Sequence, residues 1–368
     1  SSVETSMTAV PEAPDSPAPA HGSSGAGPYH ALRVARVIEE TADARSFVID
    51  VPADLRAQFG YEAGQFLTFR LEVAGERLVR CYSLASSPDT DTEHKVTVKR
   101  VADGRVSNWM NDRVRAGDVL ETMRPAGVFV LQDRATPLVL FGAGSGITPV
   151  ISIVKSALAR TSRRVRLVYA NRDAGSIIFR DELDALAAAH GDRLEVVHRL
   201  DVDHGFLDAA GVRAYVGADL DADFYVCGPT PFMDTVESTL GALGVPDGQI
   251  FVERFVSIGD PHGAVHASPE SKAGDAAPAT VRVRLDGQDH DVPYAAGKTL
   301  LAAAREAGLE PPFACEEGYC SCCMAKLVRG SVRMAANDAL DAKQLAEGWV
   351  LTCQSVPTSD EVEVEYPD

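Results

Sequence analysis

The sequence predicts a multidomain protein with three folded parts: an antiparallel β-barrel, an α/β domain with a parallel sheet, and a C-terminal α+β domain. Three observations predict this architecture. The chain has 368 residues, more than one domain of ordinary size contains. Short alternating runs near its start give way to strands that alternate with amphipathic helices. A stretch rich in Pro, Gly and Ser then separates the end of the chain from the rest.

The chain begins with a segment that has almost no large apolar side chain. Residues 1–28 are mostly Pro, Ala, Ser and Gly, which cannot offset the entropy lost on folding, so we expect a disordered tail. Residues 29–130 contain the alternating runs LRVARVIEE, SFVIDV, QFLTFRLEV, RLVRCYSL and HKVTVKRV. Because Gly, Pro and Asp part these runs, they predict a small antiparallel barrel.

Residues 131–258 contain strands that alternate with helices. PLVLF precedes TPVISIVKSALAR, RVRLVYA precedes FRDELDALAAAH, LEVVHRL follows, and DFYVCG precedes PFMDTVESTLGALG. This alternation predicts βαβ units on a parallel sheet. Residues 259–279 have the composition of a linker. Residues 280–368 then form a domain of their own, in which VRVRL and HDVPY flank a DGQ turn and KTLLAAAREAG follows as a helix.

The composition narrows the class of partner. The formal net charge is −18, with 45% hydrophobic and 24% charged residues, as in an acidic globular protein. Such a charge repels phosphate backbones and anionic lipid, so we expect neither nucleic acid nor a membrane as a partner. No apolar run is long enough to span a bilayer, and no Lys or Arg precedes Arg33 to begin a signal peptide. We expect a cytoplasmic monomer whose protein partner offers a basic face.

A glycine-rich loop, GAGSGITP at residues 142–149, lies between a predicted strand and a predicted helix. Glycines let backbone amides approach a phosphate, and the helix start behind them supplies N–H groups and a positive dipole end. The spacing differs from the G-x-G-x-x-G fingerprint. A second loop, CGP at residues 227–229, ends a strand where open α/β sheets bind ligands. A turn without a ligand and a merely buried Cys227 remain alternatives.

A strand of the barrel ends in RCYSL, residues 80–84. Arg can bind a pyrophosphate, Tyr can stack on a planar ring, and Ser can hydrogen-bond a ring nitrogen, which together suit a flavin. VKR at residues 98–100 and GRVS at residues 104–107 precede a predicted helix and offer a second phosphate site. Tyr82 as a core aromatic and Arg80 as a solvated charge remain alternatives.

Four cysteines have a spacing that is specific to one kind of site. Cys315-x4-Cys320-x2-Cys323, with Cys353 further on, is the plant-type [2Fe–2S] pattern. The alternative is structural zinc, but zinc sites pair two Cys-x2–4-Cys units and only one is present. The sequence therefore predicts a [2Fe–2S] cluster held by these four residues, with Cys322 as a spare thiol in the loop.

In this order and at these separations, the motifs of residues 29–255 are similar to those of the ferredoxin–NADP reductase superfamily, and the last domain resembles β-grasp, plant-type ferredoxins. The resemblance implies FAD in the barrel, NADH in preference to NADPH in the α/β domain, and catalytic roles for Tyr82, Ser83, Thr148 and Cys227. No role is implied for Cys81 or Cys322. The cofactor-binding residues that it implies are Arg80, Tyr82, Ser83, Leu84, Val98, Lys99, Gly104, Val106, Ser107, Gly142, Gly144, Gly146, Thr148, Gly228 and Pro229.

The order of the three domains resembles the reductase components of multicomponent oxygenases, of the 3-ketosteroid 9α-hydroxylase and phenylacetyl-CoA epoxidase type. A nicotinamide gives two electrons as a hydride and an iron–sulfur cluster accepts one, so a flavin must stand between them. The resemblance implies transfer from NADH to FAD, then through the cluster to a terminal oxygenase of the Rieske type. The alternatives are a reductase for a di-iron oxygenase or epoxidase, and a non-enzymatic iron–sulfur carrier or sensor.

Two further details stay open in the sequence. Residues 171–173, NRD, contain both an acid that suits a ribose and an arginine that suits a phosphate. Glu316 and Glu317 flank the cysteine loop and either meet a basic face of the oxygenase or form an ordinary solvated surface.

Overall fold

The structure is a computed structural model. It describes residues 29–255, 272, 274–313, 316, 318, 321–337, 339–340 and 342–366. The expected tail at residues 1–28 lies outside the described residues, and so does most of the expected linker at residues 259–279. No helix in the described ranges is both long and apolar enough to cross a bilayer.

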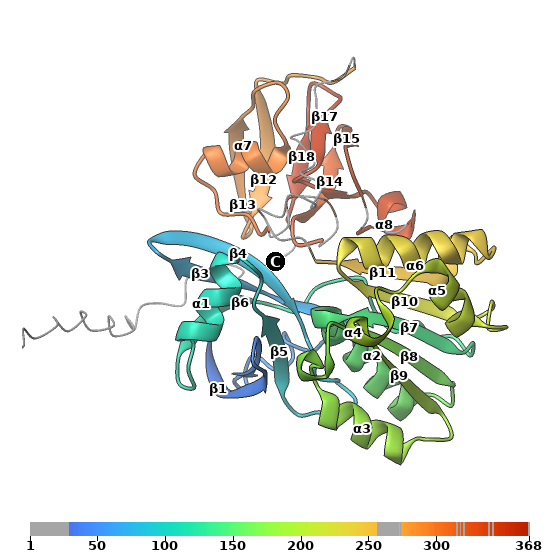
Figure 1. Cartoon of the computed structure of the whole chain (residues 1–368). Coiled ribbons are helices and arrows are strands. Elements are labelled where there is room, and N and C mark those ends of the chain that lie inside the picture. The colour runs from blue at the N-terminus through green and yellow to red at the C-terminus, as the bar shows by residue number, and fades with distance from the viewer. Residues whose placement is uncertain are drawn as a thin grey trace, which may run out of the picture.

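The first part of the chain is an antiparallel barrel, as the alternating runs predict. Its strand order is β4-β3-β6-β1-β2-β5, and a bridge between Leu84 and Val96 joins the two outer strands (Figure 1). Val106 and Met110 of α1 complete a core that contains Phe47 and Phe69. The elements are β1 (Tyr29–Thr41), β2 (Ala44–Asp50), β3 (Phe66–Val73), β4 (Glu76–Ser83), β5 (His94–Lys99), α1 (Arg105–Arg113) and β6 (Val119–Met123).

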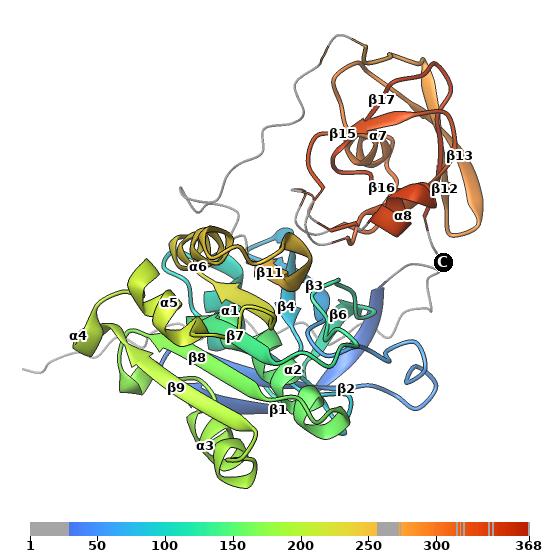
Figure 2. The same ribbon diagram turned by 90° about the vertical axis from the view of Figure 1, so that its right-hand side faces the viewer.

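The second part is a parallel sheet of order β11-β10-β7-β8-β9 with helices on both faces. Figure 2 shows α2 and α3 on one face and α5 and α6 on the other. The order reverses at β7, so the carboxyl ends of β7 and β10 border the crevice where such sheets bind ligands. The elements are β7 (Leu138–Ala143), α2 (Ile147–Arg160), β8 (Val165–Asn171), α3 (Arg180–Ala189), β9 (Leu194–Leu200), α4 (Asp201–His204), α5 (Ala209–Val216), β10 (Asp223–Gly228), α6 (Thr230–Ala242) and β11 (Ile250–Arg254).

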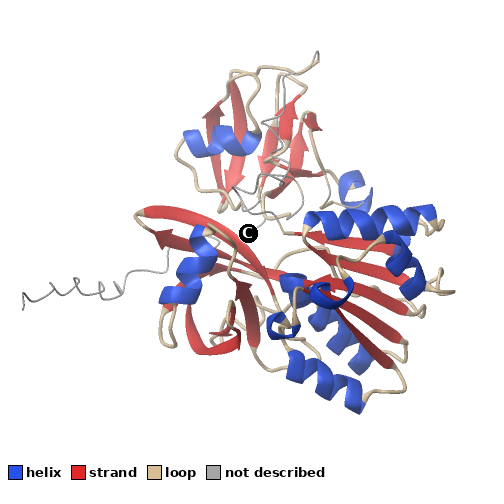
Figure 3. Cartoon of the chain, viewed as in Figure 1, coloured by secondary structure: helices blue, strands red, loops and turns tan. Residues whose placement is uncertain are grey.

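The last part is a small mixed sheet of order β13-β12-β18-β14-β16, in which β12 and β18 run parallel (Figure 3). Leu300, Ala303 and Ala304 of α7 pack on this sheet and close its core. The elements are β12 (Thr280–Leu285), β13 (Gln288–Pro293), α7 (Leu300–Glu306), β14 (Met324–Arg329), β15 (Val332–Met334), α8 (Ala342–Ala346), β16 (Trp349–Leu351), β17 (Ser355–Pro357) and β18 (Glu363–Glu365). A mixed sheet with a helix packed on it is the α+β architecture that the sequence predicts.

Candidate functional site

Ser83 ends strand β4 and has a buried hydroxyl that is free to hydrogen-bond a ligand. Its side chain is only 3% exposed, and its Oγ has no hydrogen-bond partner among the described residues. A buried hydroxyl left in this state costs about 1–3 kcal/mol, so such groups normally have a partner. The neighbouring Tyr82 is half-buried, with its ring tilted at 50° and 6.1 Å from that of Phe69. Burial raises the pKa of the Tyr82 phenol, which therefore stays neutral. A flavin ring with hydrogen-bonding nitrogens fits this position.

Two cations of the barrel remain available for an anionic group. The Arg80 guanidinium donates to the carbonyl of Val79 at 2.7 Å and makes no ion pair with a described side chain. The Lys99 ammonium lies 3.9 Å from the nearest carboxylate oxygen of Asp43, at the limit of an ion pair. A Cβ built on Gly144 would lie 3.7 Å from Lys99 Nζ, so this lysine faces the glycine-rich loop.

The start of α1 forms a close-packed turn around Gly104. A Cβ at Gly104 would fall 2.4 Å from Ser107 Oγ and 3.0 Å from the Val101 carbonyl oxygen, so a larger residue there would have to move the Ser107 side chain. The Ser107 hydroxyl accepts a hydrogen bond from the Val101 N–H at 3.2 Å. No side chain caps the first turn of α1, which leaves its N–H groups available to a phosphate. The side chains of Val106, Leu84 and Val98 fill the barrel core, so only their backbone groups can reach a cofactor.

The structure brings the two loops of the α/β domain together. Cys227 of β10 pairs with Gly142 of β7, and a Cβ at Gly146 would lie 2.1 Å from the Cys227 carbonyl oxygen. A Cβ at Gly228 would lie 2.8 Å from that of Ala143. Glycine is therefore required at both crossings, because any side chain would push the loops apart. Gly144 has a φ of +53°, which also favours glycine.

Three more predicted residues lie around this crossing. Thr148 is buried, and its hydroxyl donates to the Ser145 carbonyl at 3.0 Å. Cys227 is fully buried, and burial raises the pKa of its thiol well above its usual range, so it is a neutral thiol rather than a nucleophile. Pro229 is exposed and immediately precedes α6 at its N-cap position.

Sequence reasoning missed two polar side chains near the carboxyl end of β9, His198 and Arg199, which lie beside Asn171 at the end of β8. Both ring nitrogens of His198 and the Nε of Arg199 are buried without a partner among the described residues, as are both amide atoms of Asn171. Tyr169 and Ala170 of β8 pair with His198 and Arg199, so these groups share the ligand-binding edge of the sheet. Their place at the end of the predicted strand LEVVHRL was the available signal.

Two of the four predicted cluster ligands lie within the described residues. Cys323 and Cys353 are 2% and 4% exposed and share a buried cluster. Since β14 pairs with β16 through Met324 and Leu351, the two cysteines reach the same end of the sheet. Cys315 and Cys320 lie outside the described residues. Within the described ranges no group of three metal-ligating side chains occurs, which is expected when half of the set lies elsewhere. A pair of buried thiols fits a cluster that thiolates hold.

The cysteine loop carries two acidic residues, Glu316 and Glu317. Glu316 accepts a hydrogen bond from Arg305 at 2.9 Å, so its charge is paired within the chain. Glu317 lies outside the described residues.

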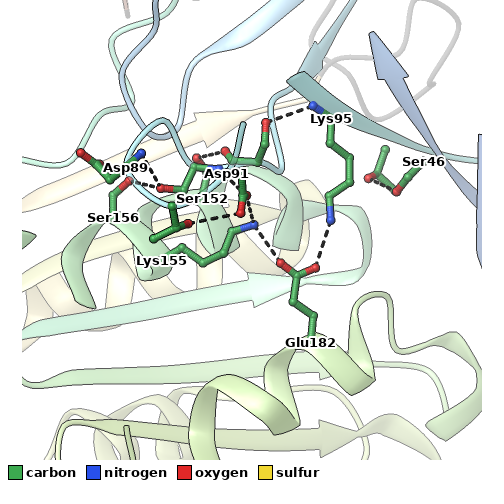
Figure 4. Close-up of polar contacts among 12 residues, drawn as sticks. Ser46, Asp89, Asp91, Lys95, Ser152, Lys155, Ser156 and Glu182 are labelled. Atoms are coloured by element: carbon green, nitrogen blue, oxygen red, sulfur yellow. Dashed lines mark hydrogen bonds and ion pairs between the residues drawn. The ribbon is translucent and has the colours of Figure 1, made fainter. Parts of the chain in front are cut away.

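A polar network fixes the α/β domain on the barrel (Figure 4). Lys155 of α2 is 5% exposed and donates to Asp91 of the barrel at 2.6 Å and to Glu182 of α3 at 2.8 Å. Lys95 of β5 donates to the other oxygen of Glu182 at 3.0 Å. Burial opposes ionisation of both carboxyls, but the lysines outweigh it and lower both pKa values. The network therefore carries charge at neutral pH and holds the two candidate binding regions in one orientation.

Comparison with known families identifies each of the three domains. Residues 31–131 match the oxidoreductase FAD-binding domain, residues 140–238 the oxidoreductase NAD-binding domain, and residues 283–358 the 2Fe-2S iron-sulfur cluster binding domain. These matches confirm the predicted order of domains and an oxidoreductase rather than a non-enzymatic carrier.

Individual proteins are similar over nearly the whole chain. The 3-ketosteroid-9-alpha-monooxygenase ferredoxin reductase component of Mycolicibacterium smegmatis is 45% identical, covering 92% of this chain and 97% of its own. A component of the 1,2-phenylacetyl-CoA epoxidase from Escherichia coli is 35% identical, covering 92% and 98%. The structure of phthalate dioxygenase reductase is 26% identical, covers 92% and 98%, and superposes with a TM-score of 0.56. The chain therefore belongs to the family of reductase components of multicomponent monooxygenases, which join FAD-binding, NAD-binding and [2Fe–2S] domains in one polypeptide.

Proposed function

We propose that this reductase takes a hydride from NADH and delivers single electrons to a terminal oxygenase of the Rieske type. The observation that carries the proposal is the approach of Lys99 to the glycine-rich loop, since a Cβ on Gly144 would lie 3.7 Å from its ammonium. A nucleotide held by that loop would thus lie beside the barrel, whose strand β4 ends in the Ser83 hydroxyl that has no partner among the described residues. When bound, FAD accepts two electrons as a hydride and releases them singly, and a [2Fe–2S] cluster takes one at a time.

In this proposal each predicted residue has a distinct task. Tyr82 packs on the flavin ring and Ser83 hydrogen-bonds its edge. Cys227, neutral and buried, borders the nicotinamide and excludes water, while the Thr148 hydroxyl fixes the loop through Ser145. The residues proposed to bind the FAD pyrophosphate are Arg80, Lys99, Gly104 and Ser107, with backbone groups of Leu84, Val98 and Val106. Those proposed to bind NADH are Gly142, Gly144, Gly146, Gly228 and Pro229. The proposed cluster ligands are Cys315, Cys320, Cys323 and Cys353.

We propose NADH over NADPH because of an ion pair at the end of β8. Arg172 donates to Asp173 at 3.0 Å, and this hydrogen bond lowers the pKa of the Asp173 carboxyl, which therefore stays ionised. A carboxylate accepts the hydroxyls of a ribose and repels a 2′-phosphate. Asp173→Ala should narrow the difference in kcat/KM between NADH and NADPH. A wild-type protein that prefers NADPH would contradict this part of the proposal.

The nature of the oxygenase and the assembly are parts of the same proposal. The 45% identity to a 3-ketosteroid-9-alpha-monooxygenase reductase supports a monooxygenase partner, which we propose to be of the Rieske type, and the 35% identity to an epoxidase component supports an epoxidase, proposed to be a di-iron enzyme, as the second candidate. Electron transfer to purified oxygenases of both kinds decides between them. We further propose a monomer with domain limits at 29–130, 131–258 and 280–368.

The test of the proposed function uses the colour and the electron acceptors of the full chain. Purified protein should show flavin and [2Fe–2S] absorption together, and a colourless protein with stoichiometric zinc would rule the proposal out. Cys320→Ser should abolish electron delivery to the oxygenase, since it removes a predicted ligand, while NADH-driven reduction of ferricyanide by the flavin continues. Loss of both activities in a folded variant would contradict the order of carriers.

A further inference from the structure

The ferredoxin domain contacts the barrel through a small apolar patch centred on Cys322, one of the two cysteines with no assigned role. Cys322 is 7% exposed although it belongs to a loop. It shares a buried cluster with Phe66 of β3, and the partly buried residues packed on this pair are Val79, Cys81 and Ala126. Figure 1 shows the ferredoxin domain over the β3 and β4 end of the barrel. A thiol of one domain is therefore buried by the surface of another.

A single hydroxyl lies between the sulfur atoms of both unassigned cysteines. Thr68 of β3 is 1% exposed, and its Oγ1 lies 3.3 Å from Cys322 Sγ and 3.4 Å from Cys81 Sγ. Both distances are within the range of sulfur hydrogen bonds. The contact between Thr68 and Cys322 spans 254 positions of sequence.

A charged contact lies at a second point of the same junction. Glu310, which follows α7 in the ferredoxin domain, accepts from Arg77 of β4 at 2.8 Å and from Arg70 of β3 at 3.2 Å. Arg70 is 18% exposed, and it is held by two hydrogen bonds to Glu121 at 2.8 and 2.9 Å and by the ring of Tyr29 at 4.1 Å. An arginine fixed in this way offers its remaining donor to Glu310 at little further cost in entropy.

The neighbours of these residues in sequence explain why the junction matters. Cys322 precedes Cys323, a predicted cluster ligand, and Cys81 precedes Tyr82, which is proposed to pack on the flavin. We propose that Thr68, Cys81 and Cys322, together with the Glu310 contact to Arg70 and Arg77, form the docking surface that positions the ferredoxin domain for one-electron transfer from the reduced flavin to the oxidised cluster. This inference rests on the proposed function, and its residues are positioning residues rather than catalytic ones.

The charged contact and the apolar patch contribute separately to docking of the ferredoxin domain on the barrel. Exposed ion pairs are individually weak, and the Glu310 side chain is 66% exposed, so the contact biases the domain toward one pose rather than locking it. Burial of Cys322 against β3 then fixes the distance between the cluster loop and the flavin strand. Reversal of the charge at position 310 should thus shift the population of docked molecules without altering either domain.

Alkylation of Cys322 in the holoprotein measures docking without relying on activity. Cys322 and Cys81 should react slowly with iodoacetamide in the wild type, read by mass spectrometry of peptides, because the junction covers them. Glu310→Lys should raise the rate for Cys322 about tenfold, by repulsion from Arg70 and Arg77. Glu361→Lys changes the same charge in an exposed pair with Arg329 of the same domain, so it serves as the matched control and should leave the rate unchanged.

The charge-swapped double variant Glu310→Arg with Arg77→Glu restores an attractive pair and should return alkylation toward the wild-type rate. The same variants are then followed by stopped-flow reduction of the cluster by NADH, where Glu310→Lys should slow cluster reduction about tenfold and leave flavin reduction unchanged. Equal alkylation of Cys322 in the wild type and in Glu310→Lys, or equal cluster reduction in both, would overturn the docking inference. A wild-type protein that fails to reduce ferricyanide with NADH would instead overturn the proposed function, so the two failures are distinguishable.

Discussion

Replacement of Lys155 by Met tests whether the network between barrel and α/β domain stabilises the protein. The ammonium lies 2.6 Å from Asp91 and 2.8 Å from Glu182, with the lysine side chain 5% exposed and each carboxylate 32% exposed. Removal of one partner from a buried ion pair costs about 3–5 kcal/mol because the remaining charges stay desolvated. Lys95 still neutralises part of Glu182, and both carboxylates reach solvent, so we expect a loss near the lower end, about 3 kcal/mol.

The loss should depend on pH in a direction that the pKa values fix. Burial disfavours the ionised forms of Asp91 and Glu182, but Lys155 and Lys95, together with the Ser87 N–H at Asp91, outweigh it and lower both pKa values in the folded state. A carboxyl with a lowered pKa stabilises the fold above its unfolded pKa of about 4, and this contribution disappears as pH falls through the folded pKa. The free energy of unfolding of Lys155→Met should therefore fall furthest below that of the wild type at pH 7. This difference in free energy should shrink as the two carboxyls become protonated below about pH 4.

Urea unfolding at several pH values measures this difference in free energy. Arg160→Met is the matched control, because Arg160 lies on the same helix and makes a longer, 3.8 Å contact with Asp89 while 54% exposed. An exposed pair of this kind contributes about 0–1 kcal/mol. The reasoning would be refuted if Lys155→Met lowered the free energy of unfolding at pH 7 no more than Arg160→Met does. It would also be refuted if the loss of free energy in Lys155→Met stayed constant down to pH 3.

Three further predictions concern the candidate binding regions. Ser83→Ala should weaken FAD binding about fivefold to tenfold in a fluorescence titration, since it removes one hydrogen bond, and should leave the unfolding of the flavin-free protein unchanged or slightly delayed. Gly146→Ala places a Cβ 2.1 Å from the Cys227 carbonyl and should cost about 1–3 kcal/mol in thermal unfolding, whereas Gly248→Ala, with no atom within 4 Å, should be neutral. His198→Ala should raise the KM for NADH about threefold to tenfold with kcat less affected, and an unchanged KM would show that this imidazole does not face the nucleotide.

The regular elements were predictable because their patterns are local. LEVVHRL coincides with β9 (Leu194–Leu200) and DFYVCG with β10 (Asp223–Gly228). A short apolar run bounded by turn-forming residues predicts a buried strand from the sequence alone. The short helix α5 (Ala209–Val216) and the edge strand β11 (Ile250–Arg254) were not predicted. All five residues of β11 are half-buried, so the strand shows no alternation, and α5 buries only Val212 and Val216, which gives a weak helical period.

The contacts between domains were not predictable, because each joins residues far apart in sequence. Lys155 and Asp91 are 64 positions apart, and no local pattern pairs a lysine inside an apolar helix with an aspartate in a loop. The burial of Cys322 likewise depends on a contact between residues far apart in sequence. Its spacing excluded it from the predicted ligand set, but the reason for a buried thiol beside the ligands becomes apparent only when β3 is seen to cover it.

Some of the carboxylates that make the chain acidic already form ion pairs within it, so they are not all open to a basic partner. A net charge of −18 favours a basic partner at long range, where the summed field steers an encounter. At short range two described carboxylates of the ferredoxin domain are already engaged, Glu316 by Arg305 and Glu310 by Arg70 and Arg77. A basic face that binds Glu310 would compete with Arg70 and Arg77 for the same carboxylate. Contact with such a partner should therefore weaken the attraction between the ferredoxin domain and the flavin barrel, because the charge of Glu310 is then shared among more cations.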